Sequence, residues 1–144
     1  MNPNEIGFYE SEYYFLSNFS AFAVEWKGRV WMTSEHAYQA AKFTEQDIQD
    51  KIFNARSAHD AKLIAKAHKD LARQDWNEVK LSTMKDICRH KLQQNEYIQR
   101  KLKQSEDKIL IETSHKDAYW GWGPNKDGEN HLGKIWMELR EELK

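Results

Sequence analysis

The segment from Thr33 to Phe43 places a carboxylate, an imidazole and an amine within eleven residues of sequence. Glu35 and Lys42 are seven residues apart, a distance over which an α-helix turns through about 700°, close to two full turns. Both side chains would therefore share one helix face, about 10 Å apart along the axis at roughly 1.5 Å per residue. That separation is too long for a simple ion pair and leaves room for a small polar ligand.

Three further residues of this segment can contribute to a site. Tyr38 and Gln39 fall on the shared face, three and four residues after Glu35. Glu35 itself lies in the predicted first turn, where free N–H groups and the helix dipole favour an anion, so its carboxylate suits a general base or a stabiliser of positive charge. His36 can contact a ligand or can be a hydrogen-bonded core histidine. A capped surface helix with stabilising charges explains the same pattern.

A second group of chemically capable residues lies nearer the C-terminus, in the sequence D-A-Y-W-G-W-G at 117–123. Trp120 and Trp122 can stack on a flat heterocycle, and Gly121 allows the backbone to approach a ligand closely. Asp117 can accept hydrogen bonds from a sugar hydroxyl or a ring N–H. The alternative is a purely structural aromatic loop.

Several other chemistries lack their sequence signals. No histidine pair at H-x-x-x-H spacing and no Asp/His cluster predicts a metal site, so neither a metal nor a cofactor is expected. No serine lies in a G-x-S-x-G turn, and no glycine-rich phosphate loop follows a strand. The single cysteine, Cys88, allows no internal disulfide and is expected to pack as a small apolar residue.

Size and charge set the broad class of the protein. With 144 residues, the chain is the size of one domain and long enough to bury a hydrophobic core. It carries 22 basic and 23 acidic residues, a balance that does not favour general nucleic-acid binding. The N-terminus has no apolar signal region, and no stretch is long enough to span a membrane. We expect a cytoplasmic protein with one domain over residues 1–144 and no membrane partner.

The elements that would position these residues form an α+β fold, mostly helical with a small β-sheet. Alternation and turn residues predict a strand at 6–9, a hairpin at 22–31 that turns at Lys27-Gly28, and a strand at 109–113. Helical periodicity predicts helices at 34–43, 45–53, 57–68, 76–103 and 131–143. Thr33 or Ser34 can cap the first of these helices, and Asn130 can cap the last one or bind a ligand.

Five stretches, in this order, resemble the NADAR, or YbiA-like, family along nearly the whole chain. They are F-Y at 8–9 with S-N-F at 17–19, W-M-T-S-E-H-A-Y-Q-A-A-K-F at 31–43, L-A-R-Q-D-W at 71–76 with R-x-K at 89–91, D-A-Y-W-G-W-G at 117–123, and N-H-L-G-K-I-W-M-E-L-R at 130–140. Met32 and His115 depart from the family pattern, which usually has proline at the first position and often at the second. The Met32 change loosens the expected turn into the helix.

The resemblance implies an N-glycosidase that hydrolyses the C1–N bond of a phosphorylated ribosylaminopyrimidine, an early riboflavin-pathway intermediate. The products would be ribose 5-phosphate and the base. Two alternatives stay open: the same chemistry on ADP-ribosylated guanine of nucleic acid, and a non-catalytic module that binds ADP-ribose or a nucleotide. A basic surface beside the tryptophan loop would favour the nucleic-acid substrate.

The resemblance also implies catalytic roles. The position of Glu35 looks like the essential carboxylate of the family, which would stabilise positive charge at C1 and orient the attacking water. Asp117 is the candidate for the paired acid. Lys42 allows a second mechanism, in which a neutral amine attacks an imine at C1 and forms a Schiff base, provided that the pKa of Lys42 is lowered.

The remaining candidates would bind the substrate. Trp120 or Trp122 would stack on the base, and Trp31 or Trp76 would complete the wall of the site. The candidates for the 5′-phosphate are Arg73, Arg89 and Lys91, since arginine suits bidentate recognition of such a group. The other residues assigned to substrate binding are Asn18, His36, Tyr38, Gln39, Gly121 and Asn130.

Overall fold

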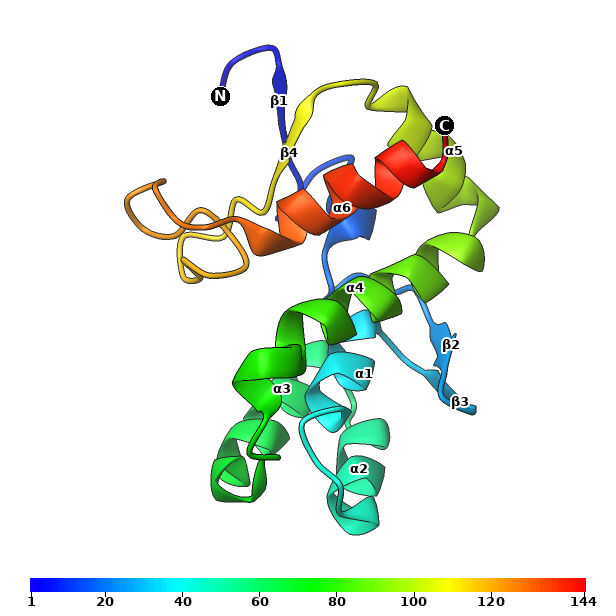
Figure 1. Ribbon diagram of the computed structural model, residues 1–144, viewed down its shortest axis with the longest axis vertical. Helices are drawn as coiled ribbons and strands as arrows, with labels where there is room; N and C mark the ends of the chain where they lie inside the picture. The colour runs from blue at the N-terminus through cyan, green and yellow to red at the C-terminus, as the bar shows by residue number, and fades with distance from the viewer. The chain divides into compact units, whose positions relative to one another are not determined.

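The computed structural model describes residues 1–144, and it contains six α-helices and two separate two-stranded β-sheets (Figure 1). The predominantly helical α+β fold predicted from the sequence is confirmed. The chain divides into two compact units, which we call the central unit, Asn18–Gln94, and the terminal unit, Met1–Ser17 with Asn95–Lys144. None of the helices combines the length and the apolar character that crossing a bilayer requires.

The central unit is built around α1 (Ser34–Ala40), in which every residue is buried. This helix packs against α2 (Gln46–Phe53), α3 (Ala58–Ala67) and α4 (Trp76–Gln93), and a short 3-10 turn, η2 (Lys69–Leu71), follows α3 (Figure 1). A helix buried on all sides forms the core of its unit. The burial of α1 therefore rules out the surface-helix interpretation of this segment.

Side-chain caps explain where α1 and α3 begin. Thr33 Oγ1 accepts a hydrogen bond from the backbone N–H of His36 at 3.2 Å, and Ser57 Oγ accepts one from Asp60 at 3.0 Å. Both capping residues have extended backbone, the usual N-cap conformation. At its other end α1 stops at Ala40, so it is shorter than the predicted helix 34–43 and Lys42 follows it.

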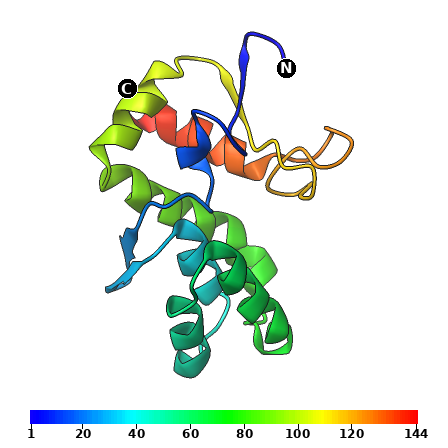
Figure 2. The same cartoon turned by 180° about the vertical axis from the view of Figure 1, so that it is seen from behind.

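The predicted hairpin is present in the central unit, where β2 (Val24–Trp26) pairs with β3 (Arg29–Trp31) in antiparallel fashion. From behind, the hairpin is seen to extend from the helices of its unit (Figure 2). Lys27 and Gly28 form its turn, with φ values of 50° and 81°. Two successive residues at positive φ match the type I′ turn, whose twist suits an antiparallel pair.

In the terminal unit, β1 (Glu5–Gly7) pairs in parallel with β4 (Ile109–Ile111), and a 3-10 turn, η1 (Tyr14–Leu16), follows β1. The C-terminal helix α6 (His131–Glu142) packs on β4. This helix buries Leu132, Ile135, Trp136 and Leu139. The indole Nε1 of Trp136 donates a hydrogen bond to the carbonyl of Leu16 at 2.9 Å, so α6 also fixes η1.

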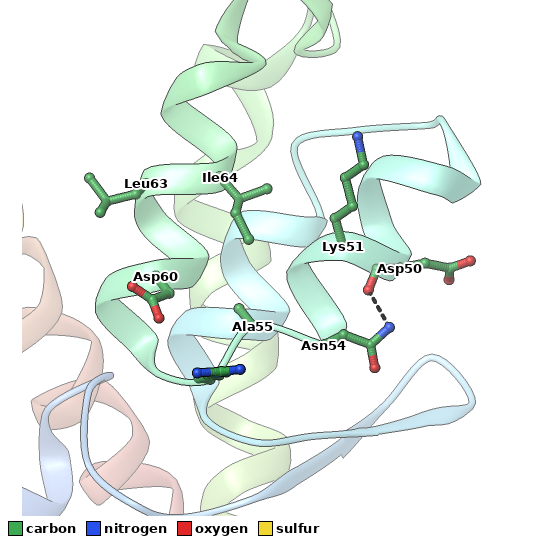
Figure 3. A pocket seen from close by; sticks show the side chains of 8 residues that line it. Asp50, Lys51, Asn54, Ala55, Asp60, Leu63 and Ile64 are labelled. Carbon is green, nitrogen blue, oxygen red and sulfur yellow. Dashed lines mark hydrogen bonds between the residues drawn. The ribbon is translucent and has the colours of Figure 1, made fainter.

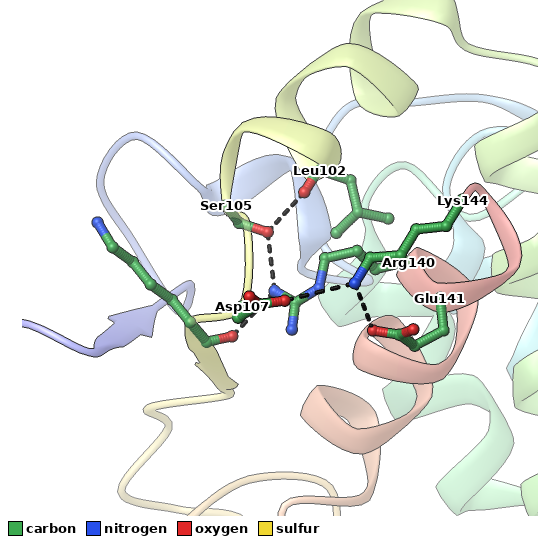
Figure 4. A network of polar contacts seen from close by, with 7 residues as sticks. Leu102, Ser105, Asp107, Arg140, Glu141 and Lys144 are labelled. Atoms are coloured by element: carbon green, nitrogen blue, oxygen red, sulfur yellow. Dashed lines mark hydrogen bonds and ion pairs between the residues drawn. The ribbon is translucent and has the colours of Figure 1, made fainter.

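A buried arginine joins α6 to the chain that leads into β4 (Figure 4). Arg140 Nη1 donates hydrogen bonds to Ser105 Oγ and to the carbonyl of Lys108, both at 2.9 Å. Ser105 is the C-cap of α5 (Glu96–Gln104), and its hydroxyl donates to the carbonyl of Leu102. Three elements of the terminal unit, α5, β4 and α6, are therefore linked through one guanidinium.

The predicted single helix 76–103 is wrong, because these residues form two helices. Helix α4 ends at Gln93 and α5 begins at Glu96, and Asn95 between them has extended backbone with φ −132° and ψ 99°. Leu92 and Ile98 are both buried, so the apolar pattern continues across the break and hides it. The sequence signal for the start of a new helix is the pair Asn95-Glu96, since asparagine is favoured at an N-cap and glutamate in the first turn.

Helix α3 is also less buried than its apolar run suggests. Ala58, Ala61 and Ala65 face the core, whereas Leu63, which would extend the same apolar pattern, is 49% exposed. Leu63 and Ile64 line an open pocket of about 610 Å³ between α2 and α3 (Figure 3). Three consecutive apolar residues cover most of a helical turn, so one of them must face away from the core.

Candidate active site

Glu35 lies in the first turn of α1, and the residue is only 6% exposed. Asn18 holds this turn: its carbonyl accepts from the backbone N–H of Glu35 at 3.1 Å, and its Oδ1 accepts from Ser34 Oγ at 3.1 Å. Asn18 Nδ2 in turn donates to the sulfur of Met84 at 3.3 Å. The side chain of Asn18, predicted to bind substrate, is thus engaged in positioning the helix that carries Glu35.

The carboxylate of Glu35 is oriented from within the same helix. Gln39, one turn further along α1 and 4% exposed, donates from Nε2 to Glu35 Oε2. The first-turn position adds the favourable field of the helix N-terminus. The structure therefore presents an oriented carboxylate in a largely dry part of the central unit.

Lys42 lies just beyond the end of α1, beside a pair of aromatic rings. Its Nζ is 5.6 Å from the ring centroid of Tyr38 and 5.9 Å from that of Trp76, and these two rings are 5.1 Å apart. Burial lowers the pKa of Lys42, two neighbouring lysines act in the same direction, and the charge of Glu35 opposes them. The direction of this pKa shift is the one that a Schiff-base mechanism needs, and Glu35 and Lys42 influence each other electrostatically.

His36 is fully buried, and both of its ring nitrogens have protein partners. Nδ1 lies 2.8 Å from Thr33 Oγ1, and Nε2 lies 3.1 Å from the carbonyl oxygen of Ala55. Burial lowers the pKa of His36, and the contact with a carbonyl oxygen requires the proton on Nε2. This geometry favours the interpretation of His36 as a core histidine over a direct contact with substrate.

The two tryptophans predicted to complete the wall have different environments. Trp31 is 4% exposed, donates from Nε1 to the carbonyl of Trp26 at 3.0 Å, and meets Phe53 edge-on at a centroid distance of 5.4 Å. Trp76, the first residue of α4, is half-buried and packs on Tyr38. Of the two, Trp76 is the one placed beside Lys42.

The predicted phosphate ligands do not form one cluster. Arg73 precedes α4, whereas Arg89 lies near its other end, about 20 Å further along at roughly 1.5 Å per residue. Arg73 is exposed, and its guanidinium binds Asp75 through two hydrogen bonds of 2.6 and 2.9 Å. It lines a groove of about 620 Å³ together with Trp31. One phosphate therefore cannot engage Arg73 and Arg89 together.

Lys91 is fully buried in the central unit. Its Nζ donates to Ser20 Oγ at 3.1 Å and lies 5.5 Å from the ring centroid of Phe22. Burial lowers the pKa of Lys91 to about 8, and the neighbouring Cys88 acts in the opposite direction. Cys88 is itself fully buried, as predicted for a small core residue. A phosphate would have to enter the core to reach Lys91.

In the terminal unit, Asp117 shapes the loop that follows β4. Its Oδ1 accepts hydrogen bonds from the backbone N–H groups of Tyr119 at 3.0 Å and Trp120 at 2.8 Å. Trp120 meets Tyr119 edge-on at 4.9 Å, and Lys126 lies over the ring of Trp122 at 5.3 Å. Both tryptophans are half-buried in a polar loop, and their role in stacking on a base stays a prediction.

Gly121 and Asn130 hold this loop against the end of β4. A Cβ on Gly121 would overlap the carbonyl of Glu112, so the close approach requires glycine. Asn130 Oδ1 accepts from the backbone N–H of Glu112, and its Nδ2 donates to the carbonyl of Leu110, both at 2.9 Å. Asn130 occupies the N-cap position of α6 as predicted, but its side chain makes no capping hydrogen bond and instead binds the backbone of β4 and of the residue after it.

Glu112, which no motif singled out, is a buried carboxyl group directly after β4. The residue is 6% exposed, and its Oε1 accepts from the backbone N–H of Ser114 at 3.2 Å. Burial raises the pKa of Glu112 to about 7, the Ser114 hydrogen bond opposes this rise, and the charge of Asp117 adds to it. The sequence does hold one signal for this residue: Glu112 directly follows the apolar run I-L-I and precedes the loop that contains Trp120 and Trp122.

The comparison with protein families decides the relationship of the chain. Residues 7–144 match the model of the NADAR domain. The chain belongs to the NADAR family. It is 34% identical over 145 residues to N-glycosidase YbiA of Escherichia coli strain K12, covering 99% of this chain and 91% of that protein.

One further relative and one solved structure extend this relationship. The chain is 39% identical over 140 residues to riboflavin biosynthesis protein VVA0006 of Vibrio vulnificus, which covers 96% of this chain but only 38% of the length of that protein. The NMR structure of E. coli YbiA matches with a TM-score of 0.89 at 33% identity, over 99% of this chain and 86% of that chain. The fold described above is therefore similar to that of the solved YbiA structure.

The raised pKa of Glu112 predicts a specific dependence of stability on pH. The unfolded chain loses the Glu112 proton near pH 4.5 and the folded chain near pH 7, so the proton stabilises the fold between these values. This contribution is complete below about pH 4.5 and is lost as the pH rises through about 7. It amounts to about 3.5 kcal/mol across the whole window from 4.5 to about 7, at about 1.4 kcal/mol per pKa unit.

Glu112→Gln, which is neutral at every pH, should lack this dependence. Urea unfolding of both proteins at pH 5 and pH 8 measures it: between these two pH values, the free energy of unfolding of the wild type should fall relative to the variant by about 2.5 kcal/mol. Parallel pH profiles of the two proteins would show that Glu112 titrates normally.

Proposed function

We propose that the chain is an N-glycosidase that hydrolyses the C1–N bond between ribose and a nitrogenous base. The observation that carries this proposal is the arrangement on α1: a buried carboxylate, Glu35, oriented by Gln39, with the half-buried amine of Lys42 close enough to respond to its charge. The E. coli relative that matches nearly the whole chain is named as an N-glycosidase, which supports the same reaction.

Glu35 fits the electrostatic demand of this reaction. Breaking a C1–N bond builds positive charge at C1 and at the ring oxygen. A fixed carboxylate in a dry site interacts with that charge more strongly than it would in water, and it needs no reorganisation during the reaction. As water attacks C1, Glu35 can take up its proton as a general base.

Lys42 supports a second route to the same products. In a ring-opened substrate, the neutral Nζ adds to the imine carbon C1 and the base leaves as an amine, which transfers the imine to Lys42. Water then hydrolyses this Schiff base, releasing ribose 5-phosphate and free lysine. Burial favours the neutral amine that the addition needs, while the charge of Glu35 and the faces of Tyr38 and Trp76 favour the ammonium.

For the substrate we propose a phosphorylated ribosylaminopyrimidine of early riboflavin synthesis. The Vibrio relative is named as a riboflavin biosynthesis protein, which supports this class, although this chain spans only 38% of its length. Arg73 is the favoured phosphate ligand, since it is exposed and its backbone N–H donates to the carbonyl of Lys42 at 2.8 Å. A phosphate would have to displace Asp75 from the guanidinium of Arg73.

ADP-ribosylated guanine is the second candidate substrate, and surface charge disfavours it. The exposed charged residues from the tip of the tryptophan loop to the start of α6 are Lys126, Asp127 and Glu129. These charges are mixed and do not form the basic surface that a nucleic-acid substrate would need.

Replacing Glu35 tests the enzyme proposal. We expect Glu35→Ala to lower kcat on a ribosylaminopyrimidine 5′-phosphate by at least about 100-fold, measured as release of the base. Glu78→Ala, which removes an exposed first-turn glutamate of α4, is the matched control and should retain activity. Near wild-type activity in Glu35→Ala would contradict the role of Glu35. Binding of ADP-ribose without turnover of either candidate substrate would contradict an enzyme altogether.

Borohydride trapping tests the Schiff-base route. If Lys42 attacks C1, borohydride added during turnover should reduce the imine and leave a sugar adduct on the wild type but not on Lys42→Ala. Lys62→Ala is the control, because Lys62 is one of the neighbouring lysines that influence Lys42. Intact-mass measurement detects the adduct, and its repeated absence from the wild type during turnover would leave Lys42 with a purely electrostatic role.

A further inference from the structure

Gln39 is the residue at which the buried polar network of α1 is incomplete. Its Nε2 is bonded to Glu35, but its Oε1 is buried and has no hydrogen-bond partner in the protein. Only one other buried side-chain nitrogen or oxygen atom in the chain, Arg140 Nε, lacks a hydrogen-bond partner. Buried acceptors without a donor are rare because desolvation is then uncompensated, so each one calls for a specific explanation.

The orientation of the Gln39 amide is fixed by its neighbour. Turning the amide by half a rotation would place Oε1 against the carboxylate of Glu35, oxygen against oxygen, and would lose the existing hydrogen bond. Glu35 therefore determines that the donor side of the amide faces the carboxylate and that the acceptor side faces away from it. The terminal torsion of glutamine is soft, so Oε1 can adjust toward a donor while Nε2 stays near Glu35.

We propose that Gln39 Oε1 accepts a hydrogen bond from the hydroxyl on C2 of the ribose, and that this contact makes the site selective for ribosyl over 2-deoxyribosyl substrates. The inference rests on the proposed function, in which Glu35 acts at C1. In the sugar, C2 is covalently bonded to C1. In the protein, Gln39 is hydrogen-bonded to the carboxylate of Glu35, which acts at C1. The amide oxygen is therefore beside the group that meets C1, where the neighbouring hydroxyl of the sugar is the nearest donor.

The same contact would contribute to catalysis as well as to recognition. As positive charge builds at C1, the adjacent C2 hydroxyl becomes a stronger hydrogen-bond donor, so its bond to Oε1 strengthens in the transition state. An interaction that strengthens in the transition state raises kcat, whereas uniform binding lowers KM only. Gln39 would thus act in two ways, through Nε2 on the orientation of Glu35 and through Oε1 on the sugar.

A comparison of two substrates separates these two actions. Wild type and Gln39→Met, which keeps the length of the side chain but removes both polar groups, are assayed on a ribosylaminopyrimidine 5′-phosphate and on its 2-deoxyribosyl analogue. Loss of Glu35 orientation slows both substrates alike, and the greater intrinsic lability of the deoxy sugar is the same in both proteins. The change in the ratio of kcat/KM values therefore reports the contact with the C2 hydroxyl.

We expect the ribosyl to 2-deoxyribosyl ratio to fall by at least about 10-fold in Gln39→Met, mainly through kcat on the ribosyl substrate. Gln49→Met, which removes a glutamine of α2 that bonds the carbonyl of Phe43, is the matched control and should keep the wild-type ratio. If both substrates slow equally in Gln39→Met, Gln39 acts only by holding Glu35 or the attacking water, and the inference is overturned while the proposed function stands.

The wild type alone provides a second test, which is independent of how well the variant folds. Its rate enhancement over uncatalysed hydrolysis should be at least about 10-fold greater for the ribosyl substrate than for the 2-deoxyribosyl analogue. Equal enhancements would overturn the inference. Turnover of neither substrate would instead overturn the proposed function on which it rests.

Discussion

The hydrogen bond from Gln39 to Glu35 is the interaction on which the candidate site depends, because it joins two polar side chains inside a helix that is buried along its whole length. A buried carboxylate is costly unless hydrogen bonds hold it. The amide of Gln39 and the field of the helix N-terminus offset this cost, and Asn18 fixes the first turn through its bonds to the backbone N–H of Glu35 and the hydroxyl of Ser34. The carboxylate of Glu35 is thereby stabilised and held in one orientation.

The charge of Lys42 follows from the same burial. Because α1 ends at Ala40, the amine lies beside the rings of Tyr38 and Trp76, where desolvation lowers its pKa and the carboxylate of Glu35 opposes the change. The two groups are therefore linked, since removing the carboxylate would also make Lys42 easier to deprotonate. The choice between a charged lysine that supports Glu35 and a neutral nucleophile is set by this balance rather than by either residue alone.

The sequence predicted those features that depend on local chemistry. Thr33 caps α1, Lys27 and Gly28 form the hairpin turn, and the apolar face of α6 is buried. These features could be predicted because caps, turns and helical periodicity depend on residues that are close together in the sequence. Glu112 escaped prediction because its burial depends on a loop that returns to β4 through contacts with residues such as Asn130, eighteen positions away. The break at Asn95 escaped because the apolar pattern continues across it.

The central claim is that Glu35 stabilises positive charge at C1, and the binding of a charged transition-state mimic tests it most directly. A five-membered imino sugar 5-phosphate, protonated on its ring nitrogen, can be compared by calorimetry with its neutral ring-oxygen counterpart. The account predicts that the wild type binds the cation at least about 100-fold more tightly and that Glu35→Gln loses this preference. The same preference in both proteins would contradict the account.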